Sequence, residues 1–204
     1  VGSGTVNLLA QSGGAVSCRA GATVEIAHIG ARRDNPLCDT SHIRVSRDVF
    51  AVVDDPEIDI LIELVGGTTV AKEIVERAIR SGKHVVTANK ALIAEFGTEL
   101  FELASEHGVA LRYEAAVAGG IPIIKALREG LAGNEINWLA GIINGTTNFI
   151  LTEMRTAKRA FADVLAEAQA LGYAEADPTF DVEGIDAAHK LVILAAIAFG
   201  IPLN

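Results

Sequence analysis

The sequence predicts an α/β chain in two parts: a parallel sheet covered by helices, followed by a smaller α+β domain. Two observations carry this prediction. Up to Ala115, short apolar runs of strand length alternate with segments of helical character. After Ala115 this alternation stops, and most segments have helical character. Regular alternation of strand and helix is typical of βαβ units, whose strands lie parallel in one sheet.

The first part contains four apolar runs that predict strands. They cover residues 24–30, 59–65, 84–87 and 110–114. Helices are expected at residues 1–11, 69–81 and 94–107. In the second of these helices Val70, Ile74 and Ala78 share one face, with charged residues opposite.

The second part is expected to mix helices with one strand. Helices are expected at residues 121–129, 146–153, 160–171 and 185–199, and the strand at residues 134–143. The change of pattern places the domain boundary within residues 115–120. The two domains are therefore predicted to cover residues 1–116 and 117–204.

Composition and charge exclude several classes of protein. Half of the residues are hydrophobic and 21% are charged, which favours a packed core over disorder. The net charge of −9 argues against a nucleic-acid partner, because phosphate binding needs a basic surface. No apolar run reaches the ~20 residues of a membrane span, and residues 191–201 are expected to form a buried helix. Cys18 and Cys38 match no disulfide or zinc pattern and are expected to be reduced thiols of a cytoplasmic protein.

The first residues are interpreted as the end of a dinucleotide-binding glycine motif. Residues 2–7 (GSGTVN) match GxGxxG only weakly, because the last glycine is missing and no strand precedes them. We expect that the first strand and the first two glycines of the motif precede Val1. Gly2 would then be the last glycine, which packs the helix closely against the sheet. An ordinary flexible start is the alternative.

Arg32 and Arg33 follow the expected strand at residues 24–30. A dinucleotide fold recognises the adenosine ribose at this point, and an arginine there accommodates a 2′-phosphate. The pair therefore favours NADP over NAD, although Asp34 leaves the use of both open. Two solvated loop arginines are the alternative.

Two more candidate positions follow predicted strands. Gly66 and Gly67 end the run at residues 59–65, and glycines there let a ligand approach the backbone at the carboxyl edge of a parallel sheet. A plain tight turn would use the same residues. Lys90 follows the strand at residues 84–87 and would point into the same crevice. Most single lysines, however, are solvated surface groups.

Residues 114–121 (EAAVAGGI) form an irregular, glycine-containing turn with one carboxylate. Such a turn can bind a hard cation through backbone oxygens. A flexible hinge between the two domains is the alternative.

Five acidic residues crowd into positions 175–186, close to Lys190. Asp186 and Lys190 are four residues apart, so both lie on one face of the expected helix, in the order that suits an ion pair. A solvated surface pair would have the same spacing. The rest of that helix is apolar, however, which places Lys190 at the edge of a buried element. A lysine there could exchange a proton with a substrate hydroxyl, and the acids could bind a substrate ammonium.

The segment at residues 168–190 (AQALGYAEADPTFDVEGIDAAHK) resembles the signature of the homoserine dehydrogenase family at every fixed position. Residues 87–92 (TANKAL) resemble a second segment of that family. Residues 113–122 resemble its cation-binding turn, and residues 141–151 (GIINGTTNFIL) resemble its NGTTNYIL segment. The resemblance covers essentially the whole chain.

The resemblance implies an NAD(P)-dependent enzyme of class EC 1.1.1.3 that interconverts L-homoserine and L-aspartate 4-semialdehyde. This reaction belongs to the biosynthesis of threonine, methionine and isoleucine. It also implies a fold, a Rossmann-type nucleotide-binding domain, and a homodimer or higher homo-oligomer. The implied site residues are Lys190 and Lys90 for catalysis, Glu175 and Asp186 for the substrate, Thr68, Lys90 and Gly172 for the cofactor, and Glu114, Val117, Gly119 and Ile121 for a sodium ion. Gly2 and Gly67 join the cofactor residues on the sequence pattern described above.

The ends of the chain depart from the family pattern. The family begins with a strand and a complete glycine motif, and it continues past Asn204. We therefore expect an incomplete nucleotide-binding sheet, and a chain that is part of a longer enzyme. Two alternatives stay open: a truncated, non-catalytic chain that dimerises, and a related dehydrogenase that acts on another amino acid.

Overall fold

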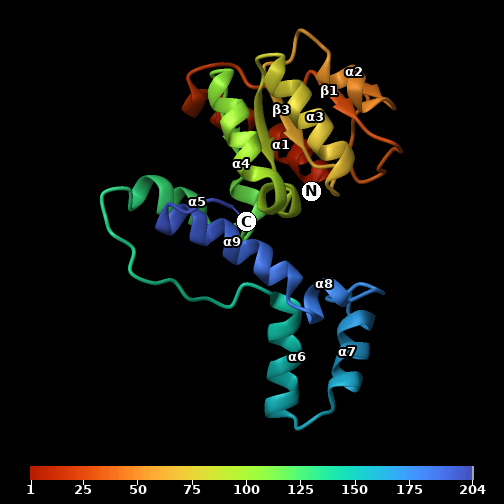
Figure 1. Cartoon of the computed structure of the whole chain (residues 1–204). Helices are drawn as coiled ribbons and strands as arrows, with labels where there is room; N and C mark the ends of the chain where they lie inside the picture. The colour runs from red at the N-terminus through yellow and green to blue at the C-terminus, as the bar shows by residue number, and fades with distance from the viewer. Residues whose placement is uncertain (204) are drawn as a thin grey trace. The chain divides into compact units, whose positions relative to one another are not determined.

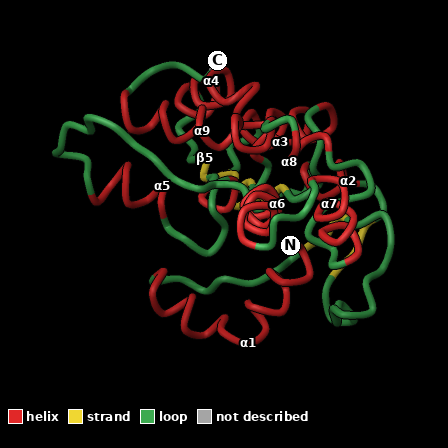
Figure 2. Tube along the Cα trace, turned by 90° about the horizontal axis from the view of Figure 1, so that it is seen from below, coloured by secondary structure: helices red, strands yellow, loops and turns green. Residues whose placement is uncertain are grey.

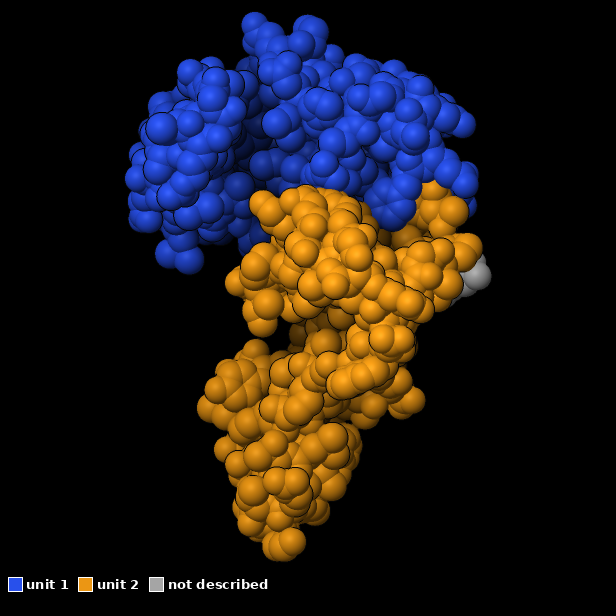
Figure 3. All heavy atoms as spheres, turned by 90° about the vertical axis from the view of Figure 1, so that its left-hand side faces the viewer, with its two compact units in different colours: residues 1–92, 99–112 blue, residues 93–98, 113–204 orange. Residues whose placement is uncertain are grey.

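The computed structural model describes residues 1–203. The chain divides into two compact units, shown in different colours in Figure 3. Unit 1 comprises residues 1–92 and 99–112, and unit 2 comprises residues 93–98 and 113–204. Unit 1 contains parallel strands with helices between them, so the predicted α/β class is confirmed. The functional division at residues 116 and 117 stays a prediction.

The strands of unit 1 form two small parallel sheets. Strands β1 (His28–Gly30) and β2 (Arg44–Ser46) pair with each other. Strands β3 (Ile60–Glu63), β4 (His84–Thr87) and β5 (Leu111–Arg112) pair in the order β3-β4-β5. Every pairing is parallel, so the carboxyl ends of β3 and β4 lie at the same edge of their sheet.

Four helices belong wholly or mainly to unit 1: α1 (Gly2–Ala20), α2 (Val49–Val53), α3 (Thr69–Arg80) and α4 (Lys90–Glu106). Helix α3 buries Ile74 and Ala78 of the predicted face, together with Val75 and Ile79, whereas Val70 at its start is exposed. Val85 of β4 is also fully buried. The core of unit 1 therefore lies between α3 and the β3-β4-β5 sheet (Figure 1).

Helix α1 differs from this pattern, because none of its residues is buried. Figure 2 shows it standing away from the other helices of unit 1. A Cβ placed on Gly2 would lie 3.8 Å from Cδ1 of Leu64, which is an ordinary contact distance. The close helix-to-sheet packing expected at Gly2 stays a prediction. A tighter glycine of unit 1 is Gly30, where a Cβ would come within 3.2 Å of Val52.

Several predicted strands are shorter than their apolar runs. The run at residues 24–30 is a strand only from His28, and the run at residues 59–65 only from Ile60 to Glu63. The apolar run of β3 is buried on one face only, because Ile60 and Ile62 are exposed. One edge of β3 has no partner strand in the described part of the chain, and a strand at such an edge is covered incompletely. Strand β2 and helix α2 were not predicted.

Unit 2 is built from helices within the described residues. They are η1 (Glu114–Ala116), α5 (Ile123–Lys125), η2 (Ala126–Gly130), α6 (Gly145–Thr156), α7 (Phe161–Ala170), α8 (Thr179–Val182) and α9 (Ile185–Phe199). Helices α6 and α7 lie side by side and bury Ile150, Val164 and Ala168 (Figure 1).

The strand predicted at residues 134–143 is not formed. This segment is an extended loop between η2 and α6, and Trp138 and Ile142 on it are exposed. A strand needs a neighbour for its backbone hydrogen bonds, and no segment of residues 1–203 pairs with this one. Its alternating apolar residues therefore predict a strand that lacks a partner here.

Helix α9 forms as predicted, but the expectation of a buried helix was too strong. Ile193 and Leu194 are buried, whereas Leu191 and Phe199 are exposed. Most other residues of α9 are half-buried. No helix within residues 1–203 is long and apolar enough to cross a membrane.

Candidate functional site

Lys190 lies on α9 and is held by two acceptors in unit 2. Its Nζ donates to Oδ2 of Asp186 at 2.6 Å and to the carbonyl oxygen of Ile143 at 2.8 Å. The Asp186 side chain is 10% exposed and that of Lys190 is 19% exposed. An ion pair this sheltered is screened far less by water than a surface pair. The structure therefore favours a defined lysine position over a solvated one.

Asn144 links this pair to a second carboxylate. Its Nδ2 donates to Oδ1 of Asp181 at 2.7 Å and to Oδ2 of Asp186 at 2.9 Å. Its Oδ1 accepts from the backbone N–H of Thr147 at 2.7 Å and so caps α6. We call Ile143, Asn144, Asp181, Asp186 and Lys190 the lysine network. It joins the start of α6 to α8 and α9.

The local sequence explains why these groups meet. Gly184 has a φ of 76°, a left-handed conformation that glycine adopts without strain, and α9 begins directly after it. Asp186 and Lys190 then lie one turn apart on the same face of α9. The carboxylate also lies in the first turn, where the helix dipole favours negative charge.

Glu175 and Gly172 lie outside this network. Glu175 is exposed, and its side chain takes part in none of the hydrogen bonds that hold Lys190 among residues 1–203. Gly172 has a φ of 76° and follows the end of α7, where Tyr173 N–H donates to the Ala168 carbonyl at 2.8 Å. This hydrogen bond is typical of a glycine that ends a helix. The proposed substrate and cofactor roles of these two residues stay predictions.

Asp177, another acid of the cluster at residues 175–186, binds backbone and side-chain groups of Thr179. Its Oδ1 accepts hydrogen bonds from the hydroxyl and the N–H of Thr179, at 2.5 and 3.1 Å. These bonds hold the pKa of the Asp177 carboxyl below its usual range. Asp177 therefore positions the start of α8.

In unit 1, the candidate cofactor residues follow β3 and β4. Gly66 and Gly67 have φ values of 76° and 68°, and a Cβ at either would meet no atom within 4 Å. Two left-handed residues in a row leave the backbone open at the carboxyl edge of the sheet. Thr68 is the residue before α3, whose amino end favours an anion such as a phosphate. These features fit a dinucleotide, as the sequence predicts.

Lys90 is the first residue of α4 and is half-buried. Asn89 caps this helix, because its Oδ1 accepts from the backbone N–H of Leu92 at 3.1 Å. Lys90 and Thr68 thus stand at the starts of the helices that follow two neighbouring parallel strands.

Arg32 and Arg33 are exposed on the loop after β1. A third arginine, which the sequence did not single out, stabilises this loop. Arg47 donates to the Ala31 carbonyl at 2.9 Å and to Oδ1 of Asp34 at 2.7 Å. Asp34 is therefore paired, while the two predicted arginines extend into solvent.

The predicted cation turn lies within unit 2. Both carboxylate oxygens of Glu114 accept backbone hydrogen bonds, from Ile124 at 3.0 Å and Lys125 at 2.9 Å. Val117 is fully buried, and Ala118 has an unusual positive φ of 49°. A cation here would be bound mainly through carbonyl oxygens, because the Glu114 side chain already caps α5.

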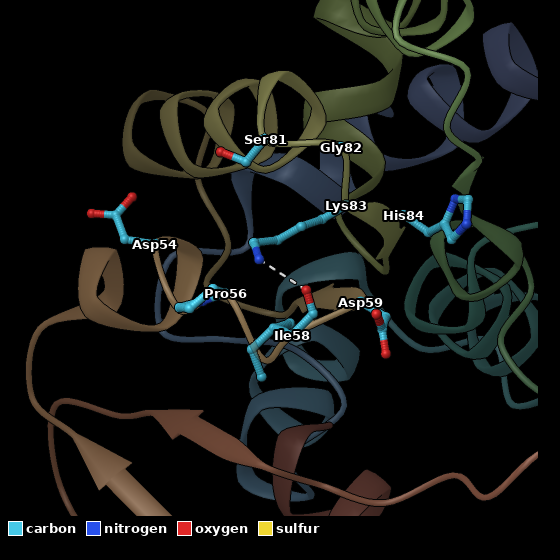
Figure 4. Close-up of a pocket in the computed structure, with 8 residues that line it drawn as sticks. All are labelled: Asp54, Pro56, Ile58, Asp59, Ser81, Gly82, Lys83 and His84. Atoms are coloured by element: carbon cyan, nitrogen blue, oxygen red, sulfur yellow. Dashed lines mark hydrogen bonds between the residues drawn. The ribbon is translucent and has the colours of Figure 1, made fainter.

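A separate open depression lies at the opposite edge of the β3-β4-β5 sheet (Figure 4). It is lined by residues before β3 and β4, among them Asp59, Gly82 and Lys83. Lys83 is buried and donates to the carbonyls of Asp55 and Ile58, at 2.7 and 2.8 Å, so it holds the loop together. Parallel sheets bind cofactors at their carboxyl edge, and this depression is therefore not the candidate site.

Comparison with known proteins assigns both parts of the chain. Residues 1–114 match the sequence profile described as homoserine dehydrogenase, NAD binding domain, and residues 122–204 match the profile described as homoserine dehydrogenase. The chain belongs to the homoserine dehydrogenase family. The resemblance seen in the sequence is thereby confirmed.

Individual relatives agree with this family. A homoserine dehydrogenase of Pseudomonas aeruginosa is 66% identical over 204 residues, which are all of this chain and 47% of the relative. A crystal structure of the Thiobacillus denitrificans homoserine dehydrogenase is 57% identical, with a TM-score of 0.95, and this chain covers 48% of it. A hyperthermophilic archaeal homoserine dehydrogenase, solved in complex with NADPH, is 37% identical over 74% of this chain and 47% of its own, with a TM-score of 0.69. The chain spans about half the length of the curated relatives it matches.

Sequence reasoning missed residues that hold the candidate site residues in place. Asn144 and Asp181 join the lysine network, although neither was assigned a role. In unit 1, Glu63 and Thr87 are buried polar residues at the ends of β3 and β4. The acidic Glu63 within the apolar run at residues 59–65 was a signal that could have found them.

Proposed function

We propose that the protein containing this chain is an NAD(P)-dependent homoserine dehydrogenase that interconverts L-homoserine and L-aspartate 4-semialdehyde. The observation that carries the proposal is Lys190, held by Asp186 and the Ile143 carbonyl within the segment that matches the family. The reduction of an aldehyde to an alcohol needs a proton at the aldehyde oxygen. An ammonium in a fixed position is suited to deliver it.

The proton donor is Lys190. An ammonium has three N–H bonds, and two of them point to Asp186 and Ile143. The third is left for the aldehyde oxygen, whose developing negative charge the ammonium also stabilises. In the opposite direction the neutral amine accepts the proton of the homoserine hydroxyl.

Substrate binding falls to the carboxylates of unit 2. Glu175 is exposed and can form an ion pair with the substrate ammonium. Asp186 acts mainly through Lys190, since its Oδ2 already accepts from Lys190 and Asn144. A carboxylate that pairs with the substrate ammonium favours an amino acid over a simple alcohol.

The cofactor belongs to unit 1. A bound nicotinamide supplies and accepts the hydride. Gly67 and Thr68 would bind it at the carboxyl edge of the sheet, together with Gly2 and Lys90, and Gly172 of unit 2 is assigned to it by family pattern. Arg32 and Arg33, exposed after β1, favour the extra phosphate of NADP. On the same family grounds we propose a homodimer and a cytoplasmic location. We also propose a sodium ion, bound by carbonyls of Glu114, Val117, Gly119 and Ile121.

The test is the substitution Lys190→Met, which removes the charge and keeps most of the volume. We expect kcat for homoserine oxidation by the complete protein to fall by roughly 10²–10⁴-fold, the usual contribution of general acid–base catalysis. Lys125→Met is the matched control, because Lys125 is an exposed lysine of unit 2 outside the lysine network. Undiminished turnover in Lys190→Met, or no homoserine oxidation by the unaltered protein, would reject the proposal.

A further inference from the structure

Glu63 is a carboxylate inside unit 1 with an exposed fraction of only 1%. It is the last residue of β3. None of its hydrogen-bond partners in the described part of the chain is a cation. Its Oε1 accepts from the backbone N–H groups of Val65 and Gly66, at 2.8 and 3.2 Å. Its Oε2 accepts from the hydroxyl of Thr87 at 2.5 Å. Burial of a carboxylate is costly unless hydrogen bonds satisfy it, so these bonds hold the turn after β3 in one conformation.

Thr87 connects the Glu63 carboxylate to the neighbouring strand. It ends β4, is fully buried, and its Oγ1 accepts from the backbone N–H of Asn89 at 2.9 Å. Asn89 then reaches back, because its Nδ2 donates to the carbonyl oxygen of Gly67 at 2.6 Å. Its Oδ1 caps α4 through Leu92. The three side chains therefore close a loop of hydrogen bonds between the two turns.

These hydrogen bonds lie at the carboxyl edge of the sheet, where parallel sheets bind cofactors. They connect the turn before α3 to the turn before α4. A sheet needs only its backbone ladder to hold β3 and β4 together. The additional side-chain hydrogen bonds fix Gly66 and Gly67 in consecutive left-handed conformations. Without such bonds, glycine exchanges easily between left-handed and other backbone conformations.

We infer that Glu63, Thr87 and Asn89 are positioning residues, which we call the turn tether. The turn tether holds Thr68 and Lys90 in position to bind the nicotinamide cofactor. The inference rests on the proposed function. None of the three is assigned to contact the reacting atoms. The tether acts by limiting the conformations of residues 65–68 before the cofactor arrives, so that less ordering is needed on binding.

Thr87→Val tests the tether. Valine keeps the shape of threonine but removes the hydroxyl, so Glu63 loses a donor and Asn89 N–H loses an acceptor. We expect the Kd of NADPH, measured by nicotinamide fluorescence on the complete protein, to rise about tenfold, because the turn must then be ordered when the cofactor binds. Thr87→Ser keeps the hydroxyl and should stay within about twofold of the unaltered protein.

Two readouts separate positioning from general destabilisation. Hydrogen exchange of residues 65–68 should be faster in folded Thr87→Val than in Thr87→Ser, while the core of α3 should exchange as before. Asn89→Ser provides a second variant outside the buried core: serine still caps α4 but cannot reach the Gly67 carbonyl. It should also raise the Kd of NADPH and leave the midpoint of thermal unfolding nearly unchanged.

The outcomes are distinguishable. Unchanged NADPH affinity and exchange in both Thr87→Val and Asn89→Ser would overturn the tether while leaving homoserine oxidation intact. Weaker NADPH binding in these variants, with no homoserine oxidation by the unaltered protein, would support the tether and overturn the proposed substrate. A protein that binds no nicotinamide cofactor would overturn both.

Discussion

Asp181 and Asp186 share a single amide, that of Asn144. The two carboxylates accept from the same Nδ2, and Lys190 neutralises only one of them directly. The position of the lysine therefore depends on a neutral donor that keeps two negative groups at hydrogen-bond distance. Without that donor, the carboxylates would repel each other and draw the ammonium away from the Ile143 carbonyl.

Asn144→Asp should disrupt this arrangement without removing the cap of α6. Aspartate caps helices as well as asparagine does, but it brings a third carboxylate where a donor is needed. We expect a loss of about 1–3 kcal/mol in the free energy of unfolding and a large fall in kcat for homoserine oxidation. Urea denaturation and steady-state kinetics measure these effects.

Asn148→Asp is the control, since Asn148 is an exposed residue of the same helix. It adds the same charge to α6 outside the lysine network. Equal losses in the two variants would show that added charge on α6, rather than the bridging amide, causes the effect.

His28 predicts a pH dependence of stability. Its side chain is 5% exposed, and its Nδ1 lies 2.7 Å from Nη2 of Arg44 and 3.0 Å from Oδ2 of Asp55. Burial, and then the positive charge of Arg44, lower the pKa of His28. Asp55 acts in the opposite direction, but it also pairs with Arg44. Because Arg44 can only donate, the neutral imidazole fits this position better.

The sign of the effect follows from linkage. A histidine whose pKa is lowered on folding binds its proton more readily in the unfolded chain. Its contribution to the free energy of unfolding is therefore fully present at high pH, where the imidazole is neutral in both states. The free energy of unfolding should fall as the pH drops below about 6.5, the ordinary pKa of histidine. Urea denaturation between pH 5 and 8 measures it. His28→Gln, which cannot gain this charge, should show a flatter profile; an equally steep profile would contradict this assignment.

At the scale of elements, Gly172 ends helix α7. Its φ of 76° is costly for any residue with a Cβ, while the Schellman hydrogen bonds need that conformation. Gly172→Ala should therefore lower the free energy of unfolding by about 1–2 kcal/mol, measured by chemical denaturation.

Gly133→Ala is its control, because Gly133 has no positive φ and a Cβ there would meet no atom within 4 Å. If Gly172→Ala also weakens NADPH binding at temperatures where the protein is folded, the cofactor role assigned to Gly172 gains support. If it changes stability alone, Gly172 serves the helix end only.

The elements also show how far sequence reasoning reaches. The burial of Ile74 and Ala78 on α3 and the pairing of Asp186 with Lys190 were predictable, because helix geometry fixes both within one segment. Asn144 reaches carboxylates 37 and 42 residues away, and no local spacing rule predicts such a contact. The segment at residues 134–143 failed for a related reason: its sequence suits a strand, but a strand exists only with a partner.

For the whole molecule, the division into two units separates the proposed roles. The turn tether and the glycines belong to unit 1, and the lysine network belongs to unit 2. Each unit has its own buried core, with Ile74 and Val85 in one and Ile150 and Val164 in the other. Cofactor binding and proton transfer should therefore be separable by substitution.

Lys190→Met and Gly67→Ala should have different effects on the complete protein. NADPH should slow hydrogen exchange at residues 63–68 and 87–92, and Lys190→Met should keep this protection while turnover is lost. Gly67→Ala places a Cβ on a residue with a φ of 68°, which shifts the turn away from its left-handed conformation. It should lose both the NADPH-dependent protection and turnover, while exchange in α6 and α7 stays as before. Loss of NADPH protection in Lys190→Met would mean that Lys190 serves cofactor binding as well as proton transfer.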